Sequence, residues 1–186
     1  MTGASGSFYS SGSNYNTGEV RLIVNWTQTF TLGNDYSTVT ISAKLQRQNT
    51  ETYTCGGTWY AWSTGGVKVG STRAVTWYEQ STTAALTSPW DVGWKATGSV
   101  KVSHTAATTV TISIDQIQWK NTTYSNSSVT IPAKSVTVTL QAVPQGLIYI
   151  DNGSGWEAYQ AYIDNGESWE MYAPYVDDGS DWSLMS

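Results

Sequence analysis

The last part of the chain repeats one short phrase three times, and each copy sets aromatic rings beside a carboxylate. The copies read YIDNGSGW, YIDNGESW and YVDDGSDW, and corresponding residues recur every 13 positions. A flat aromatic face beside Asp suits a pyranose sugar, because sugar C–H groups lie on the ring while carboxylates accept hydrogen bonds from hydroxyls. The candidate ligand-binding residues of these repeats are Tyr149, Asp151, Trp156, Tyr162, Asp164, Trp169, Tyr175, Asp177 and Trp182.

The same phrase also has the pattern of a small β-hairpin. An Asn-Gly or Asp-Gly pair stands at the centre of each copy, and both favour a two-residue type I′ turn because these residues tolerate positive φ. In that register Asp151 pairs with Ser154 and Tyr149 lies opposite Trp156, and the other two copies pair in the same way. A three-residue turn with a bulge would shift the register by one residue.

A hairpin of this length is not stable alone in water. The three copies must therefore stack on each other, on the rest of the chain or on copies from other subunits. Packing of the aromatic residues for folding is thus the competing interpretation, and the sequence leaves it open beside sugar binding. The run DNGSGWE lacks the alternating acids and closing Glu of a calcium loop, so we expect no metal there.

Two further tryptophans lie where the strand-like alternation breaks off. Trp90 and Trp94 flank Asp91 and Gly93 in the segment STTAALTSPWDVGWKATG. Loops commonly carry binding residues, so Trp90 and Trp94 form a second candidate ligand-binding surface. Two Trp side chains that plug one end of a β-domain explain the same segment equally well.

Catalysis has little support in this sequence. The single His104 and the single Cys55 have no partner residues spaced as in a nucleophilic or metal site. The six acids of residues 1–144 show no spacing that singles out a pair for glycoside hydrolysis. We therefore expect a non-enzymatic protein without a cofactor. A lone cysteine cannot form an internal disulfide, which fits synthesis in a reducing cytoplasm.

The elements that would position the candidate residues are strands. Apolar and polar residues alternate along residues 20–26 and 39–45, so one face of each segment is predicted to be buried. About nine such segments follow one another between turn clusters, including a turn at Gly65-Gly66 and a strand pair formed by residues 99–104 and 109–119. No segment has a helical pattern. The prediction is an all-β fold, a β-sandwich of Ig-like or jelly-roll-like kind followed by a C-terminal array of short hairpins.

Composition and charge divide the chain into three parts. Residues 1–16 are rich in Gly, Ser and Asn and are predicted to form a flexible or irregular arm, residues 17–144 the β-sandwich domain, and residues 145–186 the three 13-residue aromatic hairpin repeats. The first 144 residues carry all nine Lys and Arg and six acids, whereas residues 145–186 carry eight acids and no base. An acidic tail repels nucleic acid, and no apolar run reaches the length of a membrane span. We therefore expect that the chain neither binds nucleic acid nor inserts into a membrane.

Two parts of the chain resemble proteins of bacteriophage tails. The alternating run RLIVNWTQTFTLGNDYSTVTISAKLQ, the later GSVKVSH and the run SSVTIPAKSVTVTLQAVP resemble the β-rich modules of siphophage minor structural proteins, over roughly residues 17–144. Members of that family usually follow the His with an Asp-Gly turn, whereas Thr105-Ala106-Ala107-Thr108 follow His104 here. The terminal repeats resemble C-terminal extensions of phage tail proteins from Gram-positive hosts, and this second likeness is the more specific.

The resemblance implies a bacteriophage virion protein of the tail, made in the cytoplasm of the bacterial host. Aromatic hairpin repeats of this kind imply attachment to the host surface through cell-wall carbohydrate. The alternative is a purely structural virion protein whose repeats mediate subunit assembly or decorate the particle. Expected partners are other virion proteins, further copies of this chain in a homo-oligomer such as a trimer, and host cell-wall glycan. Exposure or burial of the three repeat tryptophans would discriminate between host attachment and the purely structural role.

Overall fold

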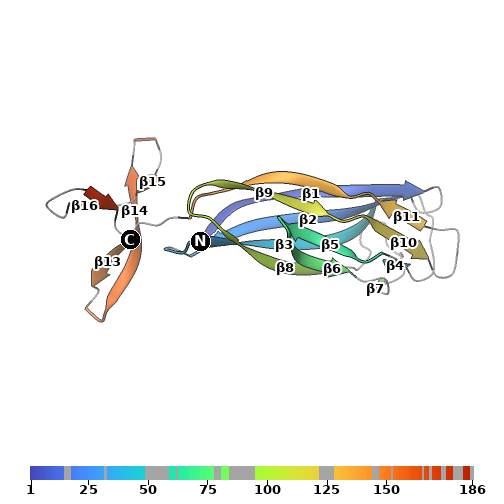
Figure 1. Cartoon of the computed structure of the whole chain (residues 1–186), viewed down its shortest axis with the longest axis horizontal. Coiled ribbons are helices and arrows are strands. Elements are labelled where there is room, and N and C mark those ends of the chain that lie inside the picture. Colours follow the sequence, from blue (N-terminus) through green and yellow to red (C-terminus); the bar gives the residue numbers. More distant parts are fainter. Residues whose placement is uncertain are drawn as a thin grey trace.

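Figure 1 shows the computed structural model of the chain, an elongated body with a smaller group of strands at one end. The structure describes residues 1–14, 18–31, 33–48, 59–61, 63–77, 81–83, 95–121, 128–143, 147–151, 153–164, 166–167, 169–172, 175–177 and 182–184. The described residues form antiparallel sheets and no α-helix, which confirms the all-β prediction. In this part of the chain no helix is long and apolar enough to cross a membrane.

The first layer of the body is a sheet of four long strands. Its order is β1 (Thr2–Asn14), β2 (Gly18–Phe30), β3 (Tyr36–Gln48) and β8 (Lys95–Ser103), all antiparallel. The alternation of apolar residues along β2 and β3 turns one face of this sheet inward. The inward residues are all at most 7% exposed, as the sequence predicted: Val20, Leu22, Val24, Trp26, Val39, Ile41, Ala43 and Leu45.

The second layer consists of two shorter sheets that follow one another along the body. One has the order β12 (Lys134–Leu140), β9 (Thr108–Ile114), β5 (Gly65–Val69) and β6 (Thr72–Trp77). The other has the order β11 (Ser128–Ile131), β10 (Ile117–Asn121), β4 (Trp59–Ala61) and β7 (Ser81–Thr83). Both pack on the first layer around one apolar core, in a β-sandwich-like arrangement (Figure 1).

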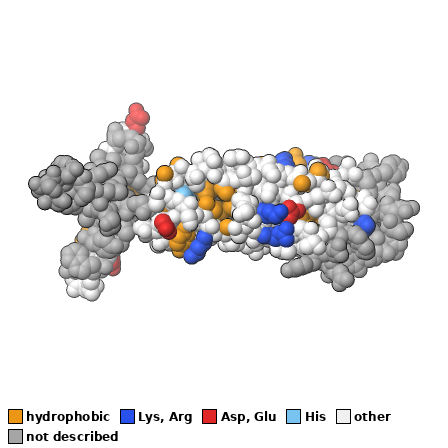
Figure 2. Space-filling view, in the orientation of Figure 1, with side chains coloured by type: hydrophobic (Ala, Val, Ile, Leu, Met, Phe, Trp, Pro, Cys, Tyr) orange, Lys and Arg blue, Asp and Glu red, His pale blue; other side chains and the backbone are white. Residues whose placement is uncertain are grey.

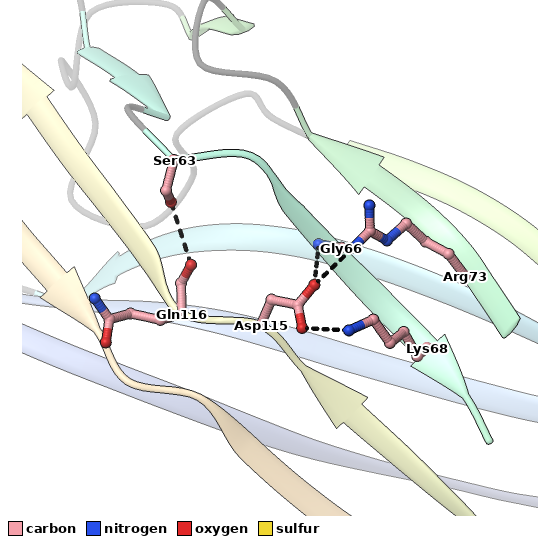
Figure 3. Close-up of polar contacts among 6 residues, drawn as sticks. All are labelled: Ser63, Gly66, Lys68, Arg73, Asp115 and Gln116. Carbon is pink, nitrogen blue, oxygen red and sulfur yellow. Dashed lines mark hydrogen bonds and ion pairs between the residues drawn. The ribbon is translucent and has the colours of Figure 1, made fainter. Parts of the chain in front are cut away.

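Side chains replace ladder hydrogen bonds where the second layer is interrupted. Between β9 and β10, the Asp115 carboxylate accepts the Gly66 backbone N–H at 3.1 Å and contacts Lys68 Nζ at 2.8 Å and Arg73 Nη2 at 3.1 Å (Figure 3). Ser63 Oγ donates to the Gln116 carbonyl at 3.2 Å. The Asp115 group thus joins three strands and leaves its carboxylate fully paired, so we assign it a structural role.

The predicted turn at Gly65-Gly66 is wrong, because both residues belong to β5. A Cβ on Gly65 would lie 2.7 Å from the indole nitrogen of Trp77, and one on Gly66 would meet the Val75 carbonyl oxygen. Close packing rather than turn geometry therefore requires these two glycines. The turn lies at Gly70, whose φ of 59° suits glycine.

The predicted pairing of residues 99–104 with 109–119 is also wrong. Strand β8 pairs with β3 in the first layer, whereas β9 pairs with β12 and β5 in the second. Residues 104–107 thus cross between the layers instead of closing a hairpin. His104 holds this crossing, because Nε2 lies 2.7 Å from Ser37 Oγ and Nδ1 lies 2.9 Å from the Ala106 carbonyl oxygen.

Residues 2–14, predicted to lie in an irregular arm, form strand β1, which pairs with β2 along most of its length. Two glycines stand on β1 where a neighbouring strand, β2 or β11, approaches it closely. A Cβ on Gly6 would lie 2.8 Å from the Trp26 indole nitrogen, and one on Gly12 would meet the Thr130 carbonyl oxygen. The Gly and Ser content that suggested an arm therefore reflects tight packing of an edge strand.

Candidate functional site

The three C-terminal repeats all contain hairpin pairs. They comprise β13 (Leu147–Asp151), β14 (Trp156–Asp164), β15 (Trp169–Tyr172), β16 (Tyr175–Asp177) and β17 (Trp182–Leu184). Strand β14 serves two hairpins, because residues 156–160 pair with β13 and residues 161–164 pair with β15. Among the described residues, β16 pairs with β17.

The register of the hairpins differs from the predicted one. Asp164 pairs with Trp169, and the same Asp-to-Trp pairing occurs in the first and third repeats, so Tyr and Trp are not directly opposite. The Asp164 carboxylate accepts the backbone N–H of Gly166 at 2.9 Å, and Gly166 has a φ of 88°. This Asx turn lengthens the connection beyond two residues. Glycine still supplies the positive φ that the Asn-Gly pattern indicated.

The register places three candidate residues on one face of the second hairpin. Asp164 lies opposite Trp169, and Tyr162 lies two residues before Asp164 on the same side of β14. Tyr162 and Trp169 are therefore diagonal neighbours, about 7–8 Å apart between Cα atoms, which large aromatic side chains can span. Trp169 is 70% exposed and Tyr162 is 47% exposed. The described face thus offers two rings and a carboxylate to solvent.

The opposite face of the ribbon is also exposed, in the part where β14 pairs with β13. Tyr159 is 45% exposed and Ile150 is 51% exposed, and Ile150 pairs with Glu157. The Tyr159 hydroxyl donates to Glu157 Oε2 at 2.7 Å, and this hydrogen bond raises the pKa of Tyr159 above its usual value. Large apolar side chains therefore meet solvent on both faces of the ribbon in a single chain.

A pocket of about 370 Å³ lies where the hairpin face meets the end of the body. Its lining combines the two exposed rings with residues from β1, from the end of β2 and from the segment after β12. The lining residues are Met1, Thr2, Phe30, Gln141, Tyr162 and Trp169. Sequence reasoning missed the four from the body, because nothing local in their segments distinguishes them from ordinary strand ends.

The body end of the pocket is held by a buried amide. Gln28 is fully buried, and its Oε1 accepts the backbone N–H of Gln141 at 2.9 Å while its Nε2 donates to the Gln141 carbonyl at 2.9 Å. Gln28 Oε1 also accepts the Ala4 backbone N–H at 3.2 Å. The backbone of Gln141 is thus fixed as if it paired with a strand, while its side chain lies on the exposed pocket wall.

The structure describes only some of the remaining candidates. Their strand positions follow from the register, but the side chains of Tyr149, Asp151, Trp156, Tyr175, Asp177 and Trp182 lie outside the described part. Trp90 and Trp94 also lie outside the described residues, as does Cys55. Among the candidates with described side chains, Tyr162, Asp164 and Trp169 lie together on one face.

Among the described residues, the body presents few reactive groups beside this pocket. Ser37 is fully buried, so its hydrogen bond to His104 lies within the packed body. The Ser37 hydroxyl is therefore not accessible to a ligand in solvent. The described residues contain no cluster of three or more His, Cys, Asp or Glu that could hold a metal ion. Figure 2 shows that the body surface on the drawn face is mostly uncharged, with scattered Lys, Arg, Asp and Glu.

A scan against protein-family models, a search of curated proteins and a search of solved structures each gave no match.

Proposed function

We propose that this chain is a non-enzymatic bacteriophage tail protein that attaches the virion to the host surface by binding cell-wall carbohydrate. The exposed Trp169 carries this proposal, because it lies on one face with Tyr162 and Asp164 at the edge of a pocket. Two neighbouring exposed rings offer a flat aromatic surface to a ligand, and a sugar ring suits such a face when hydrogen-bonding groups flank it. The resemblance to siphophage tail modules supports the virion location.

The proposal extends to the architecture. In it, the two-layered body is a β-sandwich of Ig-like or jelly-roll-like kind, and residues 145–186 are a triplet of repeats that present one aromatic face each. Several weak sites on one particle would gain affinity through effective concentration. The body would then serve to hold the repeats away from the particle.

A second candidate is a structural virion protein whose repeats bind other subunits. The exposure of Tyr159 and Ile150 on the far face of the hairpin favours this alternative, because that face also needs a cover. The two functions use opposite faces of β14 and can coexist.

The test is Trp169→Ala, compared with Trp169→Phe, in binding to purified Gram-positive cell walls. Because Trp169 is 70% exposed, its truncation should leave thermal unfolding nearly unchanged. The alanine variant should lose about tenfold in wall affinity, whereas phenylalanine keeps a flat ring and most of the binding. Wall binding that Trp169→Ala leaves intact would rule out adhesion through this residue.

A further inference from the structure

The pocket at the end of the body is lined by residues from both the tail and the body, whereas the exposed hairpin face consists of tail residues only. Tyr162 and Trp169 supply aromatic surface from the tail, and Thr2 and Gln141 supply a hydroxyl and an amide from the body. Phe30, only 7% exposed, adds apolar surface. Figure 1 shows the chain's N-terminal end beside the junction with the tail strands.

The size and polarity of the pocket limit its ligand. A volume of about 370 Å³ is at the small end of the range of about 300–1,000 Å³ for small-molecule sites, so it fits a ligand of about one sugar unit. The Gln141 amide can donate and accept, as hydroxyl and acetamido groups require. Its backbone is held by Gln28 at both N–H and carbonyl, so the amide extends from a fixed point.

Charge limits the ligand further. None of the six lining residues has a basic side chain, and residues 145–186 carry eight acids and no base. Asp164 lies opposite Trp169 on the pocket face, and one of its oxygens accepts from Gly166. Met1 also lines the pocket, and its N-terminal ammonium donates to the Phe30 carbonyl at 2.9 Å. One cation and one carboxylate therefore offset each other at the pocket, and a ligand without net charge is favoured over an anion or a cation.

We propose that this composite pocket binds one unit of a neutral glycan, with Tyr162 and Trp169 as stacking surfaces and Gln141 as the hydrogen-bonding residue. This inference rests on the proposed function and specifies its ligand class. It also assigns a recognition role to the body, which the repeats alone would not have.

The test uses the full chain and three soluble probes: an N-acetylglucosamine oligosaccharide, its de-N-acetylated cationic form and an oligosaccharide of galacturonic acid. Calorimetry should show the tightest binding for the first probe, which is neutral, and weaker binding for the two charged probes. Tyr162→Ala should lower affinity about tenfold, and Gln141→Ala about fivefold, the effect of one neutral hydrogen bond. Gln141→Ala keeps the backbone atoms that bond to Gln28, so folding should be retained.

Two variants serve as matched controls. Tyr159→Ala removes a tail tyrosine of similar exposure, 45% against 47% for Tyr162, from the opposite face of β14. Gln116→Ala removes an exposed glutamine of the body that does not line the pocket. Both should bind all probes as the unmodified chain does.

The outcomes separate this inference from the function beneath it. Normal affinity in Gln141→Ala, together with loss in Trp169→Ala, would overturn the composite pocket and leave adhesion through the tail in place. Preference for either charged probe, or failure of all three probes while cell walls still bind, would overturn the ligand class. Wall binding that survives both Tyr162→Ala and Trp169→Ala would overturn the proposed function itself.

Discussion

Gln28 shows how a single polar residue can join distant parts of this chain. It lies between Trp26 and Phe30 on the buried face of β2, and its amide bonds to backbone atoms of Ala4 and Gln141. Burial of an amide is unfavourable unless its hydrogen bonds are made, and here three are made. Gln28 therefore acts as one extra strand bridge between β1, β2 and the segment that leads to the tail.

Gln28→Leu should lower the free energy of unfolding by about 3 kcal/mol, because it leaves buried backbone groups of Ala4 and Gln141 without partners. Gln116→Leu, at an exposed position, should change it by less than about 0.5 kcal/mol. Urea unfolding followed by tryptophan fluorescence measures both. Equal midpoints for the two variants would show that the amide bonds are dispensable.

The residue types of the site could be predicted from sequence, but their arrangement could not. The threefold recurrence of Tyr, Asp and Trp marked Tyr162, Asp164 and Trp169 as candidates. The register was predicted wrongly, because the Asp164 carboxylate accepts a hydrogen bond from the Gly166 backbone N–H and the turn is longer than two residues. Phe30 and Gln141 join the pocket through tertiary contacts alone, which no local pattern reveals.

At the scale of elements, the two layers of the body touch along both edges. Strand β1 contacts β11 and β12 at one edge, and β6 contacts β8 at the other. Glycine permits the close approach: a Cβ on Gly12 would meet the Thr130 carbonyl oxygen, and one on Gly98 would meet the Ala74 carbonyl oxygen. Bringing the edges together in this way also leaves less of them open to pairing with other chains.

Gly98→Ala should therefore destabilise the body by about 2 kcal/mol, because a backbone carbonyl cannot move aside as a flexible side chain can. Gly155→Ala is the matched control, since a Cβ there would meet nothing within 4 Å and the residue has no positive φ. Differential scanning calorimetry should show a lower transition temperature for Gly98→Ala only. Indistinguishable transitions would mean that the edges are looser than the structure has them.

Strand periodicity predicted β2 and β3 well, because long alternating runs with one buried face have few alternatives. It failed where polar or small residues replace the alternation. The inward face of β1 carries Ala4, Gly6 and Ser10 beside a single large apolar residue, Phe8, and the break at Asp115 depends on side-chain bonds to another strand. These features are set by contacts between segments that are distant in the sequence, and a single segment does not encode them.

At the scale of the whole molecule, the charge is divided between a body of net charge +3 and a tail of net charge −8. The tail's described ribbon of β13, β14 and β15 also exposes apolar side chains on both faces, and a single layer of short strands has no core of its own. If the pocket face binds glycan, the face that carries Ile150 and Tyr159 remains to be covered. A second copy of the same tail presents the same apolar residues and can cover it in a closed, symmetric contact.

Such an assembly should strengthen as salt is raised, because like-charged acidic tails repel each other and salt screens that repulsion within about 10 Å at 0.1 M. Light scattering and sedimentation at micromolar protein concentration should show an oligomer. Its dissociation constant should decrease when the salt concentration is raised from about 0.02 M to about 0.5 M. Docking of the acidic tail on the positively charged body of a neighbour would give the opposite trend. The double variant Ile150→Ser/Tyr159→Ser should dissociate the oligomer and keep glycan affinity per site, because Tyr162 and Trp169 lie on the other face. A chain that stays monomeric with an ordered tail, or an oligomer that the double variant leaves unchanged, would contradict assembly through this face.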